Sequence, residues 1–306
     1  MNLQNALWEH KQRHSKMKNL LTIIFGLLTI TAFGQTVELK WKIGEKEKLN
    51  YLTVMSDIDT SKVEINFDDL FKSFSDSTEK GSLETKDLFK ELNKYMQSVD
   101  YISTLTNKGN GIIDIVLTTR QKEKTKEVAK DKTDGEENEM LKMMKSMNQG
   151  VMLRGSVYAT GGIHSFWVKN DQKNLISTFF ELPTKPVKVG DSWKLDISLT
   201  ANDQNFKCDS SYKVNEVTLT DIKKEKGETI AVLKYNIVEY VKGTFSLPSF
   251  MSGGGEQKAM MKSTHQAIAE FSIDKGRWIM YDGIMSLDAT GFMTVKKKTK
   301  FKLISE

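Results

Sequence analysis

The chain has 306 residues, of which 28% are charged, with a formal net charge of +5 and one cysteine. This small charge excess argues against nucleic-acid binding, which needs a clustered positive face. Cys208 can form no disulfide within the chain, so we expect the hydrophobic core alone to hold the fold.

The N-terminal part of the chain has the pattern of a signal peptide. Lysines precede an apolar run at residues 20–33, LLTIIFGLLTITAF, which is too short for a comfortable transmembrane helix. Small residues at 32 and 34 predict cleavage before Gln35, and Met17 indicates that residues 1–16 are an over-extended start. No cysteine lies near the cleavage site. We therefore expect an exported, soluble protein, periplasmic or secreted, with no lipid anchor and no transmembrane segment.

Cleavage before Gln35 would leave 272 residues as a single secreted β-rich domain, with two halves joined near residues 181–190 as the alternative arrangement. The predicted signal segment contains four basic residues and one acidic residue. It therefore accounts for +3 of the net charge of +5 and leaves about +2 on the mature chain.

The first half of the mature chain mixes strand and helix patterns. Residues 37–43, 49–58 and 63–67 read as strands, and residues 99–106 and 112–119 form a predicted hairpin. An apolar stripe predicts a helix over residues 84–98. A charged stretch at 122–138 leads into a second predicted helix, residues 136–149, which is rich in methionine: Met140, Met143, Met144 and Met147.

The middle of the chain contains a hairpin, a short helix and a proline junction. Residues 153–159 and 163–168 form the predicted hairpin, and residues 171–180 a short helix. Pro183 and Pro186 exclude helix and central strand at the junction. Trp193 then begins a run that alternates apolar and polar side chains, as a half-buried strand does. We expect Trp193 to be a buried anchor, with ligand stacking as the alternative.

The rest of the chain reads almost entirely as strands, at 206–219, 229–240, 263–273, 276–287 and 290–303, in the serial order of an antiparallel meander. The lysines between 296 and 302 indicate an exposed edge strand. Residues 243–262 interrupt the pattern with apolar side chains and three consecutive glycines at 253–255. We predict a hinged flap there, with a permanently docked plug as the alternative.

These patterns together predict an α+β fold. A long curved antiparallel sheet, a half-barrel-like meander, would carry a few helices inserted in the N-terminal half, and these helices would cover its concave face. This outline is similar at the level of fold to the half-barrel envelope carriers that shuttle lipoproteins, a likeness that carries little weight for function.

Three short motifs carry a resemblance to a family. They are Gly155-Ser156-Val157, the stretch at residues 161–166, and the junction at 183–193. With them, the chain from about residue 150 onward resembles a family of secreted envelope proteins of Gram-negative bacteria, a domain of unknown function. The resemblance implies export and a β-rich fold, and it implies no activity.

The sequence favours a non-catalytic protein without cofactor or metal. No hydrolase, nucleotide-binding or metalloprotease motif occurs, and Cys208, His164 and His265 share no catalytic or ligand spacing. Thioether side chains suit adaptable apolar surfaces. We therefore predict binding of an apolar small molecule or lipid through two Met-rich segments, namely Met140, Met143, Met144, Met147, Phe250, Met251, Met260 and Met261. The alternatives are a structural or interaction module that acts through the sheet surface, with unknown protein partners, and a carboxylate-based hydrolase.

Overall fold

The fold was analysed in a computed structural model, which describes residues 35–59, 63–65, 98–122, 151–166, 170–198, 206–247, 255–291 and 293–305. The chain divides into two units, Met1–Thr36 and Val37–Glu306. All the elements described below belong to the second unit. The predicted signal segment lies outside the described residues. No helix among the residues described is long and apolar enough to cross a membrane.

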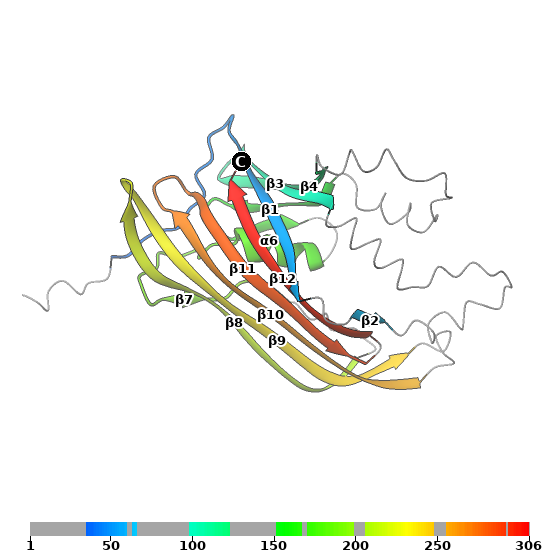
Figure 1. The fold of residues 1–306 in the computed structure, drawn as a ribbon. Helices are drawn as coiled ribbons and strands as arrows, with labels where there is room; N and C mark the ends of the chain where they lie inside the picture. Colours follow the sequence, from blue (N-terminus) through cyan, green and yellow to red (C-terminus); the bar gives the residue numbers. More distant parts are fainter. Residues whose placement is uncertain are drawn as a thin grey trace, which may run out of the picture. The chain divides into compact units, whose positions relative to one another are not determined.

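A single antiparallel sheet of twelve strands dominates the second unit (Figure 1). The elements in chain order are β1 (Lys48–Asp59), β2 (Val63–Ile65), β3 (Val99–Gly109), β4 (Ile112–Gln121), β5 (Val151–Tyr158), β6 (Ile163–Phe166), α6 (Asn170–Phe180), β7 (Ser192–Trp193), β8 (Phe206–Glu225), β9 (Glu228–Leu247), β10 (Gly255–Ser272), β11 (Arg277–Thr290) and β12 (Met293–Ser305).

The strand order across the sheet is β6-β5-β4-β3-β1-β12-β11-β10-β9-β8-β7, and β2 pairs with β12 beside this path. Neighbours in the chain are therefore mostly neighbours in the sheet, as a meander predicts. One exception is β1, which lies between β3 and β12 and so joins the strands of the first half to those of the second. The two edge strands, β6 and β7, follow each other in the chain and are connected by α6 and the proline junction.

The predicted α+β class is wrong. Almost all regular structure among the described residues is antiparallel strand, and α6, which follows β6, is the one helix described in full. The helices predicted at 84–98 and 136–149 lie outside the described residues, apart from Ser98. Alternation with a period of two residues sets the structure of most of the described part of the chain, and strands therefore outweigh the single helix α6.

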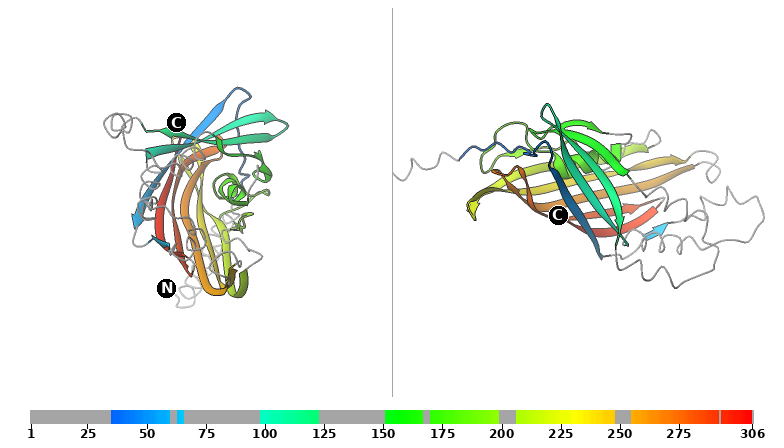
Figure 2. Two further views of the ribbon diagram at one scale, coloured as in Figure 1. Left: turned by 90° about the vertical axis from the view of Figure 1, so that its right-hand side faces the viewer. Right: turned by 90° about the horizontal axis from the view of Figure 1, so that it is seen from above.

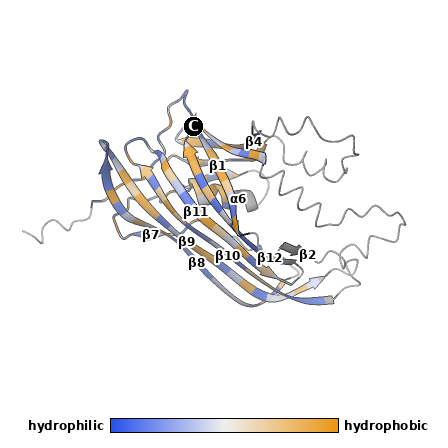
Figure 3. Ribbon diagram, in the orientation of Figure 1, coloured by the Kyte–Doolittle hydropathy of each residue, from blue (hydrophilic) through white to orange (hydrophobic). Residues whose placement is uncertain are grey.

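That alternation gives the sheet two different faces (Figure 3). The sheet is curved, and α6 lies on its concave side, which we call the inner face (Figure 2). Along β9, for example, Leu233, Tyr235 and Ile237 are buried on the inner face, whereas Lys234 between them is exposed on the opposite, outer face. The hydrophobic core therefore lies between the inner face, α6 and the segment around Trp41.

Tight turns join the hairpins as the sequence suggested. The turn between β3 and β4 places Asn110 and Gly111 at φ values of 54° and 70°. Two consecutive positive φ angles match the right-handed twist of the flanking strands, and Asn and Gly adopt them most easily. The hairpin predicted at 99–106 and 112–119 is thus confirmed, with longer strands.

Two segments predicted to be strands, at residues 37–43 and from Trp193 onward, form little or no strand in the structure. Residues 37–43 bury alternate side chains as expected, but they form no strand of the sheet. Val37 and Val187 exchange hydrogen bonds of 2.7 and 2.8 Å in an isolated bridge, and the backbone N–H groups of Trp41 and Lys42 donate single bonds to Ala159 and Gly276. Strand β7 has only two residues, and Trp193 in it is half-buried, while Leu195 and Ile197 beyond it are buried. Trp193 thus packs against the core but is only partly buried, unlike the fully buried anchor that was expected, because the chain leaves the sheet directly after it.

Two predictions about the last strands also need correction. The segment predicted as an inserted flap continues the β9–β10 ladder: Gly243 pairs with Ala259 and Phe245 with Gln257. Only residues 248–254 of that segment lie outside the described part. The lysine-rich strand β12 is not at an edge, because it pairs with β1 on one side and β11 on the other.

Candidate ligand-binding site

Helix α6 shapes the candidate site because it covers part of the inner face. Its side chains Ile176, Phe179 and Phe180 are buried toward the sheet. The close approach depends on Gly155 in β5, where an added Cβ would lie 2.2 Å from Cδ1 of Ile176. The amphipathic stripe of the helix therefore packs directly onto the backbone of the sheet.

Two tryptophans hold the C-terminal end of α6. The indole N–H of Trp278 donates a hydrogen bond of 2.7 Å to the carbonyl of Phe179, and that of Trp41 donates one of 3.0 Å to the carbonyl of Phe180. The last carbonyls of a helix have no partner within the helix, and leaving them buried and unpaired is unfavourable. Tyr51 adds a further link by accepting a 2.9 Å bond from the backbone N–H of Trp278. These bonds fix the helix relative to β1 and β11.

Glu181 joins the end of α6 to the chain beyond the proline junction. Its carboxylate accepts hydrogen bonds from the Ser177 hydroxyl and, at 2.9 Å, from the backbone N–H of Asp196. Burial raises the pKa of this carboxyl group above its usual range, although both hydrogen bonds act in the opposite direction. The Glu181 carboxylate therefore links the end of α6 to the segment around Asp196 at the edge of the hydrophobic core.

An apolar cavity of about 260 Å³ lies between α6 and the inner face. All its lining residues except Thr53 and Ser103 have apolar or aromatic side chains. They come from β1, β3, β4, β5, β12 and α6 and are Thr53, Met55, Tyr101, Ser103, Leu117, Met152, Leu153, Leu175, Ile176, Phe179, Phe180 and Phe301. Its lining, as far as the described residues form it, contains no Asp, Glu, Lys, Arg or His, so the cavity is suited to an uncharged, apolar molecule or group.

A buried polar cluster lies beside Phe179 on the inner face. The His265 Nε2 and Tyr281 Oη atoms are 2.6 Å apart, and the Phe179 ring packs against Tyr281 with 5.1 Å between ring centroids. Burial lowers the pKa of His265 to about 4 and raises the pKa of Tyr281 and of Tyr235 above the usual range. All three groups are therefore neutral near pH 7. Among the described residues, Tyr235 Oη and His265 Nδ1 find no hydrogen-bond partner.

Most of the residues predicted to bind a ligand lie outside the part of the chain that the structure describes. Met140, Met143, Met144, Met147, Phe250 and Met251 lie outside the described residues. Met260 and Met261 lie in β10 and, because neighbours in a strand alternate, point to opposite faces. Met261 is on the inner face beside Val241 and Ala289, and Met260 is on the outer face beside Lys242 and Thr290. Neither of them lines the cavity.

Sequence reasoning missed the residues that do line it. Leu175, Ile176, Phe179 and Phe180 were inside a predicted helix, and their spacing of three to four residues was a sign that this helix covers an apolar surface. The contributions of Met55, Tyr101 and Phe301 could not be found from local pattern, since they depend on which strands become neighbours.

The described part of the chain gathers no metal site or thiol–imidazole pair. Cys208 is exposed in β8, His164 is exposed in β6, and His265 is buried in β10. The ring nitrogen Nδ1 of His164 bonds to the Ser156 hydroxyl at 2.9 Å. Among the residues described, no group of three or more His, Cys, Asp or Glu side chains could hold a metal ion.

No family model, curated protein or solved structure matches the chain. The resemblance to a secreted envelope family therefore stays a prediction that depends on the three motifs. One motif residue has a physical explanation, because Gly155 makes room for Ile176. That role concerns the packing of α6 and gives no information about activity.

Proposed function

We propose that this protein is a non-catalytic, exported binding protein that holds an apolar small molecule or part of a lipid between α6 and the inner face of the sheet. The observation that supports the proposal is the cavity of about 260 Å³ with its almost wholly apolar lining. A cavity of about 150 Å³ lined by aliphatic and aromatic side chains already accommodates benzene. The present cavity would therefore hold a small apolar molecule or one end of an acyl chain.

Two features of the lining support binding rather than catalysis. The side chains that contact the cavity include Met55 and Met152, whose flexible thioethers adapt to ligands of different shape. Among the described residues of the lining, the polar side-chain groups are those of Thr53, Ser103 and Tyr101. A hydroxyl group can orient a ligand by one hydrogen bond.

The proposal can be tested with saturated fatty acids of increasing length, titrated into the protein by calorimetry. We expect binding with a negative heat-capacity change, the mark of apolar burial. The variant Thr53→Phe fills the cavity and should weaken binding at least tenfold. Val54→Phe is the matched control, since Val54 is the next residue and is exposed on the outer face. Equal binding by both variants, or no binding by the wild-type protein, would refute the proposal.

The proposed location is the periplasm or the extracellular space, and it depends on the apolar run at residues 20–33. N-terminal sequencing of protein recovered from a secreting host tests this part separately. A first residue of Gln35 is expected, and retention of residues 20–33 would contradict export by a cleaved signal peptide.

A further inference from the structure

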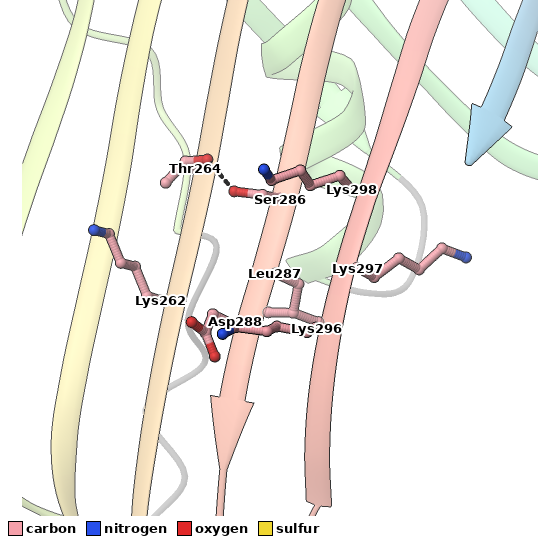
Figure 4. A pocket seen from close by; sticks show the side chains of 8 residues that line it. All are labelled: Lys262, Thr264, Ser286, Leu287, Asp288, Lys296, Lys297 and Lys298. Carbon is pink, nitrogen blue, oxygen red and sulfur yellow. Dashed lines mark hydrogen bonds between the residues drawn. The ribbon is translucent and has the colours of Figure 1, made fainter. Parts of the chain in front are cut away.

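The outer face of the sheet has a basic groove across β10, β11 and β12 (Figure 4). It has a volume of about 360 Å³ and is lined by Lys262, Thr264, Ser286, Leu287, Asp288, Lys296, Lys297 and Lys298. Figure 4 shows Lys296 and Lys298 extending from β12 over β11, while Lys297 extends the other way. The groove and the inner-face cavity lie on opposite faces of the sheet, and β12 is the strand that contributes to both.

The lysines of the groove are less well neutralised than their neighbours. Asp288, the one carboxylate among the described residues of the lining, is the cross-strand partner of both Lys262 and Lys296. Within the described part of the chain, no ion pair within 4.0 Å involves Lys262, Lys296 or Lys298. Three lysines against one aspartate leave a local charge of about +2 on this part of the outer face.

The next lysines along β12 are paired. The carboxylate of Asp282 lies 3.2 Å from Lys300 Nζ and 3.3 Å from Lys302 Nζ. These residues are on the same strand and the same face as Lys296 and Lys298, because they differ by even numbers of residues. The positive potential is therefore concentrated at the groove and not spread evenly along β12.

Hydroxyl groups complete the groove. Thr264 on β10 and Ser286 on β11 are hydrogen-bonded to each other, as the dashed line in Figure 4 marks. A pair of hydroxyls has two protons and uses only one of them in their shared bond. The second proton can be donated to an anionic oxygen that enters between the lysines.

Exposed apolar and aromatic side chains lie beside the groove on the same face. Ile284, two residues before Ser286 on β11, is 43% exposed, and Ile268 on β10 is 51% exposed. Tyr240 is the cross-strand partner of Lys262 and stacks on Tyr212, with ring centroids 5.1 Å apart. Lysines beside exposed isoleucine and tyrosine are the combination found where proteins contact anionic membrane surfaces.

We propose that the outer face of β10–β12 binds an anionic lipid surface, with lipid phosphate groups in the basic groove and the neighbouring isoleucines at the headgroup boundary. Charge complementarity supports this partner, since the groove offers three cations and a hydroxyl donor to a phosphate. The exposed isoleucines favour a membrane over a soluble anion, because a soluble anion leaves them in water. This inference is independent of the proposed apolar cargo.

The test is sedimentation with vesicles of phosphatidylcholine alone and of phosphatidylcholine mixed with phosphatidylglycerol. The wild-type protein should bind only the mixed vesicles, and added salt should release it. Each groove lysine near the surface should contribute roughly fivefold to the binding constant, so the K296Q/K298Q variant should bind about 25-fold more weakly. K300Q/K302Q is the matched control with the same loss of charge, and it should bind within about threefold of wild type.

Three results would overturn the proposal. One is no binding of the wild-type protein to the mixed vesicles, and a second is equal weakening by the two double variants, which would show attraction by net charge alone. The third is binding of inorganic phosphate in the absence of vesicle binding, which would indicate a site for a small soluble anion. If K296Q/K298Q fails to fold by circular dichroism, acetylation of the wild-type protein decides: mixed vesicles should protect Lys296 and Lys298 from the reagent, and unchanged labelling would overturn the proposal.

Discussion

The contact between Gly155 and Ile176 gives the sharpest test of how α6 packs on the sheet. In Gly155→Ala the new Cβ would lie 2.2 Å from Ile176 Cδ1 and 2.9 Å from the carbonyl oxygen of Ser165. Carbon atoms pack best at about 3.5–4.0 Å, so the overlap with the isoleucine exceeds 1 Å in rough terms and cannot be absorbed without movement. Overpacking of this kind costs about 1–3 kcal/mol, and we expect the free energy of unfolding to fall by about that amount.

A second substitution shows whether the expected cost comes from this contact. Ile176→Val removes the Cδ1 methyl group and by itself should cost about 0.5–1.5 kcal/mol. In the double variant, the nearest remaining side-chain atom of residue 176 lies near the Cγ1 position, 3.4 Å from the new Cβ of residue 155. Most of the overlap with this side chain is therefore removed. We therefore expect the double variant to be more stable than the sum of the single changes predicts, by at least about 1 kcal/mol.

The measurement is urea unfolding followed by tryptophan fluorescence, analysed as a double-mutant cycle. Gly162→Ala is the control in the same hairpin, because its new Cβ would be 3.3 Å from Thr184 Cγ2, an exposed side chain that can move. That control should change stability by less than about 0.5 kcal/mol. Additive effects of Gly155→Ala and Ile176→Val, within about 0.5 kcal/mol, would refute the close packing of α6 on β5.

Two further predictions concern the tryptophans and the buried histidine. Trp278→Phe leaves the Phe179 carbonyl buried without its donor and should cost about 1–3 kcal/mol in urea unfolding. Trp193→Phe is its control and should cost clearly less, because Trp193 Nε1 has no hydrogen-bond partner among the described residues; equal losses would contradict the anchoring role of Trp278. Burial holds the pKa of His265 at about 4, below the value of 6.5 for an unfolded chain, so the unfolded state binds the proton first. Stability should therefore fall by up to about 3 kcal/mol as the pH drops from 6.5 to 4. The raised pKa of Glu181 makes stability change with pH in the opposite direction above pH 4.5. The pH series is therefore measured in the Glu181→Gln variant. If adding His265→Leu to this variant leaves the dependence of stability on pH unchanged, His265 is excluded as its cause.

Local pattern predicted the strands of this protein better than their arrangement. The alternation of Leu233, Tyr235 and Ile237 follows from a two-residue period, and the turn at Asn110-Gly111 follows from residues that accept positive φ. Residues 37–43 alternate just as clearly, yet they form a bridge with Val187 and not a strand of the sheet. Alternation shows that a segment has a buried face, but it does not show whether backbone partners are present on both sides.

The cavity could not be predicted for the same reason. Its wall brings Met55 of β1 and Phe301 of β12 together with Phe179 of α6. The two strands meet through the pairing of Met55 with Phe301, and no feature near either residue specifies that choice of partner. The Met-rich segments are unusual in composition, whereas the cavity is lined by ordinary core residues whose packing is set by distant contacts.

The pairing of β1 with β12 has a consequence for how this sheet is formed. The hydrogen-bonded side chains of Asp57 and Thr299 are 242 residues apart in the chain. Closing a flexible loop of that length costs about 5 kcal/mol of entropy by the logarithmic relation, whereas each hairpin closes over a few residues. We expect the hairpins to form first and this contact last, as in other sheets dominated by distant pairings. Until β1 and β12 pair, each of these two strands presents an unpaired edge, so the time between synthesis and closure is when this chain is most prone to aggregate.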